Sequence, residues 1–140
     1  MFRIIVPGEP CGKQRARTFY DPRVGRVVSK TPEKTKSYET LIRELFATKY
    51  EGAVPLQGPA VLHVFIYRGI PKSTSMKKAA MMESGLIRPT TKPDCSNVLK
   101  AVEDALNGLA YRDDSQLVDE FPHKYYSATP RVEIRVEPWP

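Results

Sequence analysis

The stretch AVLHVFIYR, residues 60–68, constrains the fold of this chain more than any other segment. Its side chains alternate between two faces, and both faces carry apolar residues: Leu62, Val64 and Ile66 on one, and Val61, His63, Phe65 and Tyr67 on the other. A strand that is apolar on both faces is typical of the interior of a sheet, so we expect a central strand here. Residues 131–137 also alternate, with charges on one face, and predict a further strand.

Helical and strand patterns interleave along the rest of the chain. Strands are expected at residues 2–6 and 116–126, the latter interrupted by Pro122, and a hairpin is expected from the runs 17–20 and 26–29. Helices are expected from Thr31-Pro32, a hydroxyl N-cap followed by proline, to about Tyr50, and over 73–84 with a buried face of Met76, Ala80 and the pair Met81-Met82. A third is expected over the apolar stripe Val98, Leu99, Val102, Ala105 and Leu106, which Asn107-Gly108 ends. The pattern predicts an α/β (α+β) fold, with a mixed β-sheet packed against two main helices in a single domain, residues 1–140.

Composition excludes several classes of protein. No apolar run approaches the roughly 20 residues that span a membrane, and the N-terminal residues lack the long apolar core of a signal peptide. We expect a cytoplasmic location, with Cys11 and Cys95 as reduced thiols. His63 and His123 have no partner at metal-ligand spacing, so we interpret both as structural.

The formal net charge of +6 is concentrated in the N-terminal third. Residues 1–49 hold eleven Lys and Arg against five Asp and Glu, whereas the charges of residues 50–140 balance. This asymmetry favours a polyanionic partner such as nucleic acid, although a solvated basic surface is the alternative interpretation. The predicted DNA-contacting residues are Lys13, Arg15, Arg17, Arg23, Arg26 and Lys92.

Acidic residues gather in KPDCSNVLKAVEDALNGLAYRDDSQ, residues 92–116. Asp94 stands at the start of the predicted helix, where it could cap the backbone, or Ser96 could cap and leave Asp94 free. Lys100 and Asp104 share the polar side of that helix and could form an ordinary ion pair. If the chain returns beside the helix, Asp113 or Asp114 could approach Asp94, and grouped carboxylates favour Mg²⁺ or Mn²⁺.

The same 25 residues resemble the signature of the RusA family of Holliday-junction resolvases. The shared pattern is KPD-x-x-N-x-x-K-A-x-x-D-A-L-N-G-x-x-Y-x-D-D-x-Q, and the segments GKQRAR and SKTPEKTKSYE nearer the N-terminus also agree with phage-type members. The resemblance implies a homodimeric, Mg²⁺-dependent endonuclease that resolves four-way DNA junctions by paired cuts in recombination and repair. It implies no small-molecule cofactor, and it suggests a bacterial or phage-encoded chain.

The resemblance also assigns site residues. It places catalytic roles on Asp94, Lys100 and Asp114, and metal binding on Asp94, Asp113 and Asp114. The family motif usually reads D-x-D-N, and here Ser96 replaces the second aspartate. Three interpretations of this departure stay open: the remaining acids suffice for cleavage, the chain binds junctions but cuts weakly, or Ser96 is a helix cap. A generic RNA-binding module is a further alternative, without a matching motif.

Overall fold

The computed structural model describes residues 1–14, 17–30 and 32–140. Its main sheet has four strands in the order β1–β6–β4–β5: β1 (Phe2–Pro7), β6 (Arg131–Pro138), β4 (Ala60–Gly69) and β5 (Leu117–Ser127). β6 pairs antiparallel with β1 and with β4, whereas β4 pairs parallel with β5. The sheet is therefore mixed, and residues 60–68 lie inside it as predicted.

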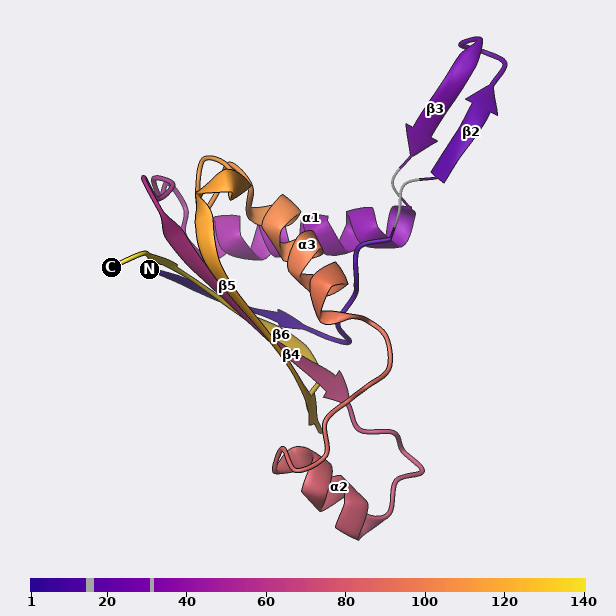
Figure 1. Cartoon of the computed structure of the whole chain (residues 1–140), viewed down its shortest axis with the longest axis vertical. Helices are drawn as coiled ribbons and strands as arrows, with labels where there is room; N and C mark the ends of the chain where they lie inside the picture. Colours follow the sequence, from indigo (N-terminus) through magenta and orange to yellow (C-terminus); the bar gives the residue numbers. More distant parts are fainter. Residues whose placement is uncertain (15–16, 31) are drawn as a thin grey trace.

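Two long helices cover one face of this sheet. α1 (Glu33–Lys49) and α3 (Cys95–Leu106) lie side by side on that face, whereas the shorter α2 (Met76–Glu83) contacts β5 (Figure 1). The predicted α+β arrangement with two main helices is confirmed. None of the helices in the described part of the chain is long and apolar enough to cross a membrane.

The core lies between these helices and the sheet. α1 contributes Tyr38, Ile42 and Phe46, at intervals of four residues, and α3 contributes Val98 and Val102. Facing them, the inward side chains of the sheet are almost fully buried: Ile4 and Val6 of β1, Leu62, Val64 and Ile66 of β4, and Val132, Ile134 and Val136 of β6. Side chains repeat on one side of a helix about every 3.6 residues and on one side of a strand every 2 residues, so each element presents one apolar side to the core.

The opposite face of the sheet carries aromatic side chains that stack on one another. The ring of Phe65 lies 5.4 Å from that of His123, and Tyr67 lies 5.7 Å from Tyr125. This explains why residues 60–68 are apolar on both sides although the long helices cover one side. His63 contacts Glu137 at 3.1 Å across the sheet, in agreement with the interpretation of this histidine as structural.

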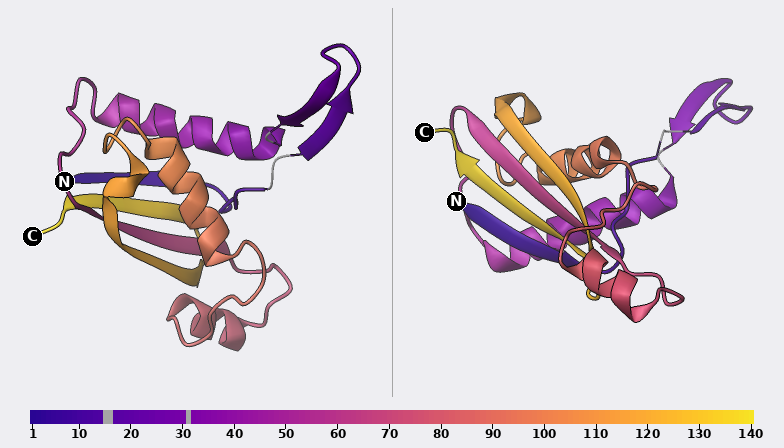
Figure 2. Two further views of the ribbon diagram at one scale, coloured as in Figure 1. Left: turned by 45° about the horizontal axis from the view of Figure 1, so that its top comes forward. Right: turned by 60° about the horizontal axis from the view of Figure 1, so that its bottom comes forward.

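A separate two-stranded sheet projects from the body of the molecule. β2 (Arg17–Asp21) and β3 (Arg26–Lys30) pair antiparallel, as the sequence predicts for a hairpin (Figures 1 and 2). Gly25 adopts a positive φ of 67° in the connecting turn, a conformation that costs glycine less than other residues.

The structure corrects two details of the sequence interpretation. Of the predicted buried face of α2, Met82 is confirmed, whereas Met76 is 91% exposed and Ala80 and Met81 are exposed as well. Pro122 does not interrupt β5, which is continuous from Leu117 to Ser127. An edge strand tolerates a proline because the missing N–H needs no partner on its free side. The predicted N-cap Thr31 lies outside the described residues, and α1 itself begins at Glu33.

Candidate active site

Lys100 lies at the centre of an acidic cluster on the polar side of α3. Its ammonium is 3.3 Å from the Asp104 carboxylate, 3.8 Å from Glu103 and 3.9 Å from Asp114. The hydrogen bond to Asp104 and the charge of Asp104, followed by the charges of Glu103 and Asp114, raise the pKa of Lys100. The lysine side chain remains about half exposed, so a charged amine faces solvent beside several carboxylates.

The chain returns to α3 because Tyr111 anchors the turn that follows the helix. Its side chain is fully buried, and its hydroxyl donates a hydrogen bond of 2.8 Å to the Glu103 carbonyl. Gln116 holds the next segment by donating to the carbonyls of Leu56 and Gly58. These bonds place Asp114, in the turn that precedes β5, beside Lys100.

The two adjacent aspartates have different environments. Asp113 caps the short 3₁₀ turn η1 (Asp114–Gln116), where its carboxylate accepts a hydrogen bond of 3.1 Å from the Ser115 N–H. Hydrogen bonds from Ser115 lower the pKa of Asp113. Asp114 is directed toward Lys100 instead. Of the pair, Asp114 is thus the carboxylate positioned beside the lysine.

Glu103 belongs to this cluster although sequence reasoning did not select it. Burial is the main cause that raises its pKa to about 7, followed by a hydrogen bond to Glu120 and the charge of Glu120. Glu103 lies three residues after Lys100, and that helical spacing was the available signal. Its partner Glu120 lies in β5, so the carboxyl pair forms only through the tertiary structure.

Asp94 stands at the other end of this polar side, at the N-cap position of α3. Its side chain is exposed and makes no capping hydrogen bond, so the first interpretation, a helix cap, does not hold. Ser96 is exposed in the first turn of the helix. Lys100 follows Asp94 by six residues, or about 9 Å along the helix axis.

Asp94 lines a large groove whose volume is about 1330 Å³. Two segments border it near the helix: the chain around Gly12, whose neighbour Lys13 donates its backbone N–H to the Asn97 carbonyl at 2.9 Å, and the loop before Asp94. Five cationic side chains line the groove, against the acids Glu9 and Asp94: Lys13, Lys34, Arg68, Lys72 and Lys92. The groove thus combines an exposed carboxylate with a largely basic wall.

Two strands hold the loop that precedes Asp94. The Arg68 guanidinium at the end of β4 donates to the Thr91 hydroxyl and the Lys92 carbonyl. Lys124 of β5 donates to the Thr91 carbonyl at 2.6 Å. Arg68 was not predicted from the sequence, because nothing in the local pattern of residues 60–68 shows that its end meets residue 92.

The predicted basic residues fall into separate places. Lys92 lines the groove, and Arg17, Arg23 and Arg26 lie on the β2–β3 hairpin. Arg15 lies outside the described residues. Lys13 lines the groove, but its ammonium forms ion pairs with Asp104 and, at 3.1 Å, with Glu39. Burial acts to lower the pKa of Lys13, but the hydrogen bonds to Asp104 and Glu39 have the larger effect together, so the pKa is raised.

Asp94, Asp113 and Asp114 do not converge on one point. Across residues 1–14, 17–30 and 32–140, no three or more His, Cys, Asp or Glu side chains are grouped closely enough to hold a metal ion. Cys11 and Cys95 are free thiols, as predicted. Carboxylates nevertheless line the polar side of α3 at both ends, with Lys100 between them.

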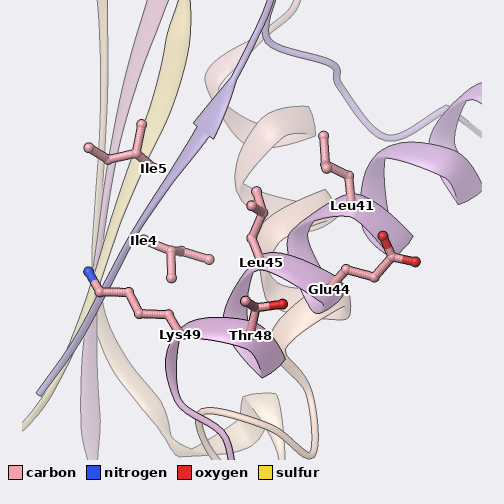
Figure 3. Close-up of a pocket in the computed structure, with 7 residues that line it drawn as sticks. All are labelled: Ile4, Ile5, Leu41, Glu44, Leu45, Thr48 and Lys49. Carbon is pink, nitrogen blue, oxygen red and sulfur yellow. The ribbon is translucent and has the colours of Figure 1, made fainter.

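Another hollow, of about 390 Å³, lies between α1 and β1 (Figure 3). Its lining is mainly apolar, from Ile4, Ile5, Leu41 and Leu45, and includes none of the predicted site residues. The basic groove at Asp94 is therefore the better candidate for a phosphate-bearing substrate.

Two comparisons with known proteins bear on this site. The sequence model of the family described as "Endodeoxyribonuclease RusA" matches residues 7–137. The uncharacterized protein YqaN of Bacillus subtilis (strain 168) is 42% identical over 136 residues, which are 96% of this chain and 94% of that protein. The family match spans the groove, α3 and Asp114.

Proposed function

This chain belongs to the RusA family of endodeoxyribonucleases, and on that premise we propose that it resolves four-way (Holliday) DNA junctions. The reaction is phosphodiester hydrolysis by paired cuts, in DNA recombination and repair. The single observation that carries the proposal is the basic groove, which presents the exposed carboxylate of Asp94 among five cationic side chains.

The proposed catalytic residues are Asp94, Lys100 and Asp114. Lys100 is half exposed and positively charged, so it can stabilise the negative charge that develops on a phosphate under attack. Asp114 lies 3.9 Å from the ammonium of Lys100, which Asp104 and Glu103 also contact, so a bound phosphate would share the lysine with these carboxylates. Asp94 contributes a carboxylate that no capping bond engages.

Mg²⁺ is the proposed cofactor, with Mn²⁺ as an alternative, and Asp94, Asp113 and Asp114 are the proposed ligands. Proteins usually hold Mg²⁺ through one or two carboxylates together with waters and substrate phosphates. No three carboxylates converge among the described residues, so an ion would be held by one or two of the proposed ligands, with waters and phosphate oxygens of the bound DNA completing its coordination. When bound, such an ion would polarise the phosphodiester and lower the pKa of an attacking water.

DNA binding is proposed to use the groove and the hairpin together. Lys92 in the groove, and Arg17, Arg23 and Arg26 on the hairpin, are exposed cations suited to phosphate contacts. Lys34 and Lys72, which the sequence did not single out, are exposed and extend the groove wall. Phosphate contacts give affinity without sequence readout, which suits recognition of DNA shape.

The proposal is tested with a synthetic four-way junction. We expect Asp94→Asn and Asp114→Asn to abolish Mg²⁺-dependent cleavage while junction binding persists, and Lys100→Met to slow cleavage about 10²–10³-fold. Glu51→Gln, at an exposed carboxylate away from the groove, is the matched control. If the wild-type chain neither binds nor cuts the junction at any divalent-ion concentration, the resolvase assignment is wrong.

A second candidate function is a junction-binding protein with weak or lost cleavage. The observation that favours it is Ser96, an exposed serine two residues after Asp94, where the resemblance places an aspartate. A hydroxyl is a weaker Mg²⁺ ligand than a carboxylate. Comparing wild type with Ser96→Asp decides between the two: cleavage gained only in Ser96→Asp supports the binder, whereas cleavage by both supports the nuclease.

A further inference from the structure

The β2–β3 hairpin exposes an unusual amount of apolar surface for its size. Four large apolar side chains in this short ribbon are exposed: Phe19 at 45%, Tyr20 at 63%, Val24 at 54% and Val27 at 62%. The two strands form a sheet of their own, away from the four-stranded sheet, and project from the body (Figures 1 and 2). Clustered exposed apolar groups mark a contact surface.

The register of the hairpin sorts its side chains onto two faces. Tyr20 pairs with Val27, and Thr18 pairs with Ser29. Because side chains alternate along a strand, these four lie on one uncharged face. The other face carries Phe19 and Val28, with the pairs Arg17–Lys30 and Asp21–Arg26 on either side. Each face thus has one exposed aromatic ring, and one of the rings is framed by cations.

The charge of the hairpin decides between possible partners. Its acid, Asp21, accepts hydrogen bonds from the backbone N–H of Arg23 at 2.9 Å and from the Arg23 Nε at 3.3 Å. Arg17, Arg26 and Lys30 remain as positive surplus. The same hairpin of a second copy would bring like charges together, whereas a polyanion would be attracted to this surplus.

Nucleic acid also explains the aromatic rings. Base faces stack on aromatic side chains, and neighbouring cations follow the backbone phosphates. In an intact duplex the base faces are hidden by their neighbours, but at a branch point stacking is interrupted and base faces become accessible. A ribbon with one ring on each face suits the space between two diverging DNA arms.

We propose that the β2–β3 hairpin is a branch-recognition element, in which Tyr20 and Phe19 stack on bases exposed at the DNA branch point. Arg17, Arg26 and Lys30 bind the flanking phosphates. This inference rests on the proposed function, because it names the part of the same substrate that the hairpin contacts.

The test measures binding of the full-length chain in EDTA, so that cleavage does not interfere. Fluorescence anisotropy is recorded for a four-way junction and for a linear duplex, each at three salt concentrations. Tyr20→Leu keeps an apolar side chain but removes the ring. We expect it to weaken junction binding about 5- to 100-fold, the effect of losing a base–aromatic stack, by the same factor at every salt concentration. Duplex affinity stays within about twofold.

Matched variants separate ring, apolar bulk and charge. Tyr20→Phe keeps the ring and is expected to bind the junction like wild type, and Val24→Ala removes exposed apolar surface without a ring and is expected to do the same. Arg26→Ala is expected to reduce the slope of log affinity against log salt by about one, for both DNAs. An unchanged thermal unfolding midpoint shows that Tyr20→Leu leaves the body of the protein folded.

Several results would overturn the inference. If Tyr20→Leu binds the junction as tightly as the wild-type chain does, Tyr20 does not stack on bases. The same conclusion follows if Tyr20→Leu loses equal affinity for the junction and for the duplex. If sedimentation velocity shows that Tyr20→Leu converts a dimer to a monomer, the hairpin is a contact between copies of the chain. If the wild-type chain does not distinguish junction from duplex, the proposed function itself fails and the inference falls with it.

Discussion

Glu103 illustrates how the fold changes the chemistry of a single residue. Its pKa rises from an ordinary 4.5 to about 7, because the carboxyl is buried and shares a hydrogen bond with Glu120. Between these two pH values the folded chain therefore keeps a proton that the unfolded chain has released. By linkage, the free energy of unfolding falls as pH rises through this range and levels off above about 7.

Glu103→Gln is expected to remove this pH dependence. The variant should match wild type below pH 4.5 and exceed its free energy of unfolding at pH 8 by the order of 1 kcal/mol. Urea denaturation in EDTA between pH 4 and 8 measures the difference, with Glu51→Gln at an exposed site as control. Parallel curves for wild type and Glu103→Gln would contradict the assignment.

Lys13 lies where two roles compete. It lines the basic groove, but its ammonium already joins Glu39 of α1 to Asp104 of α3. Lys13→Gln removes the cation from Glu39 and leaves Asp104 with Lys100 alone, so we expect a loss of stability of about 1–2 kcal/mol. The exposed Lys92→Gln should leave stability unchanged and reduce the salt dependence of DNA binding by about one. If Lys13→Gln instead leaves stability unchanged and lowers the salt dependence of DNA binding, as expected for Lys92→Gln, Lys13 acts mainly as a DNA contact rather than as an ion-pair partner.

At the scale of elements, the position of α3 depends on a close contact with the N-terminal segment. A Cβ atom on Gly12 would lie 2.9 Å from the Cβ of Asn97 and 3.1 Å from that of Pro93. Neither atom is at the end of a flexible side chain, so a larger residue at position 12 must move the backbone. Glycine at this position lets the segment around Lys13 lie directly against the start of α3.

A double-mutant cycle tests this contact. Gly12→Ala is expected to lower the free energy of unfolding by about 1–3 kcal/mol, because overpacking strains the helix contact. In an Asn97→Gly background the nearer Cβ is gone, so the same substitution should cost at least about 1 kcal/mol less. Urea denaturation of the four proteins provides the coupling energy. Strictly additive effects would show that the two residues do not press against each other.

The elements also show why local patterns predicted some structure and missed other parts. The spacing of apolar residues in α1 and α3, and their alternation in β4 and β6, predict which side of each element is buried. The buried residues of these four elements confirm those predictions. Pro122 was misread because an edge position depends on strand order, which no local pattern contains. Met76, Ala80 and Met81 were predicted to be buried and are exposed, because α2 packs inward through Met82, the residue of that face that was predicted correctly.

At the scale of the molecule, a branched substrate with near two-fold symmetry suits a two-fold protein. We expect two chains of 15.8 kDa each to bind one junction, as measured by sedimentation velocity. Paired cuts by such a dimer should convert a cruciform-bearing plasmid mainly to linear product, because both strands are cut within one binding event. A single chain per junction, with nicked circles as the main product, would contradict the homodimer proposal.

The sequence by itself determined the family signature in residues 92–116, the pattern of helices and strands, and the basic N-terminal third, since periodicity, motif spacing and charge are local properties. The tertiary structure decided which charges meet. Asp113 caps a turn while Asp114 lies beside Lys100, Glu103 pairs with Glu120, and Arg68 reaches the loop before Asp94. The cap at Asp113 is local, whereas the other three contacts join segments that are distant in the sequence and that the turn at Tyr111 and the placement of β4 and β5 bring together. Such contacts depend on strand order and chain return, which residue spacing alone does not encode.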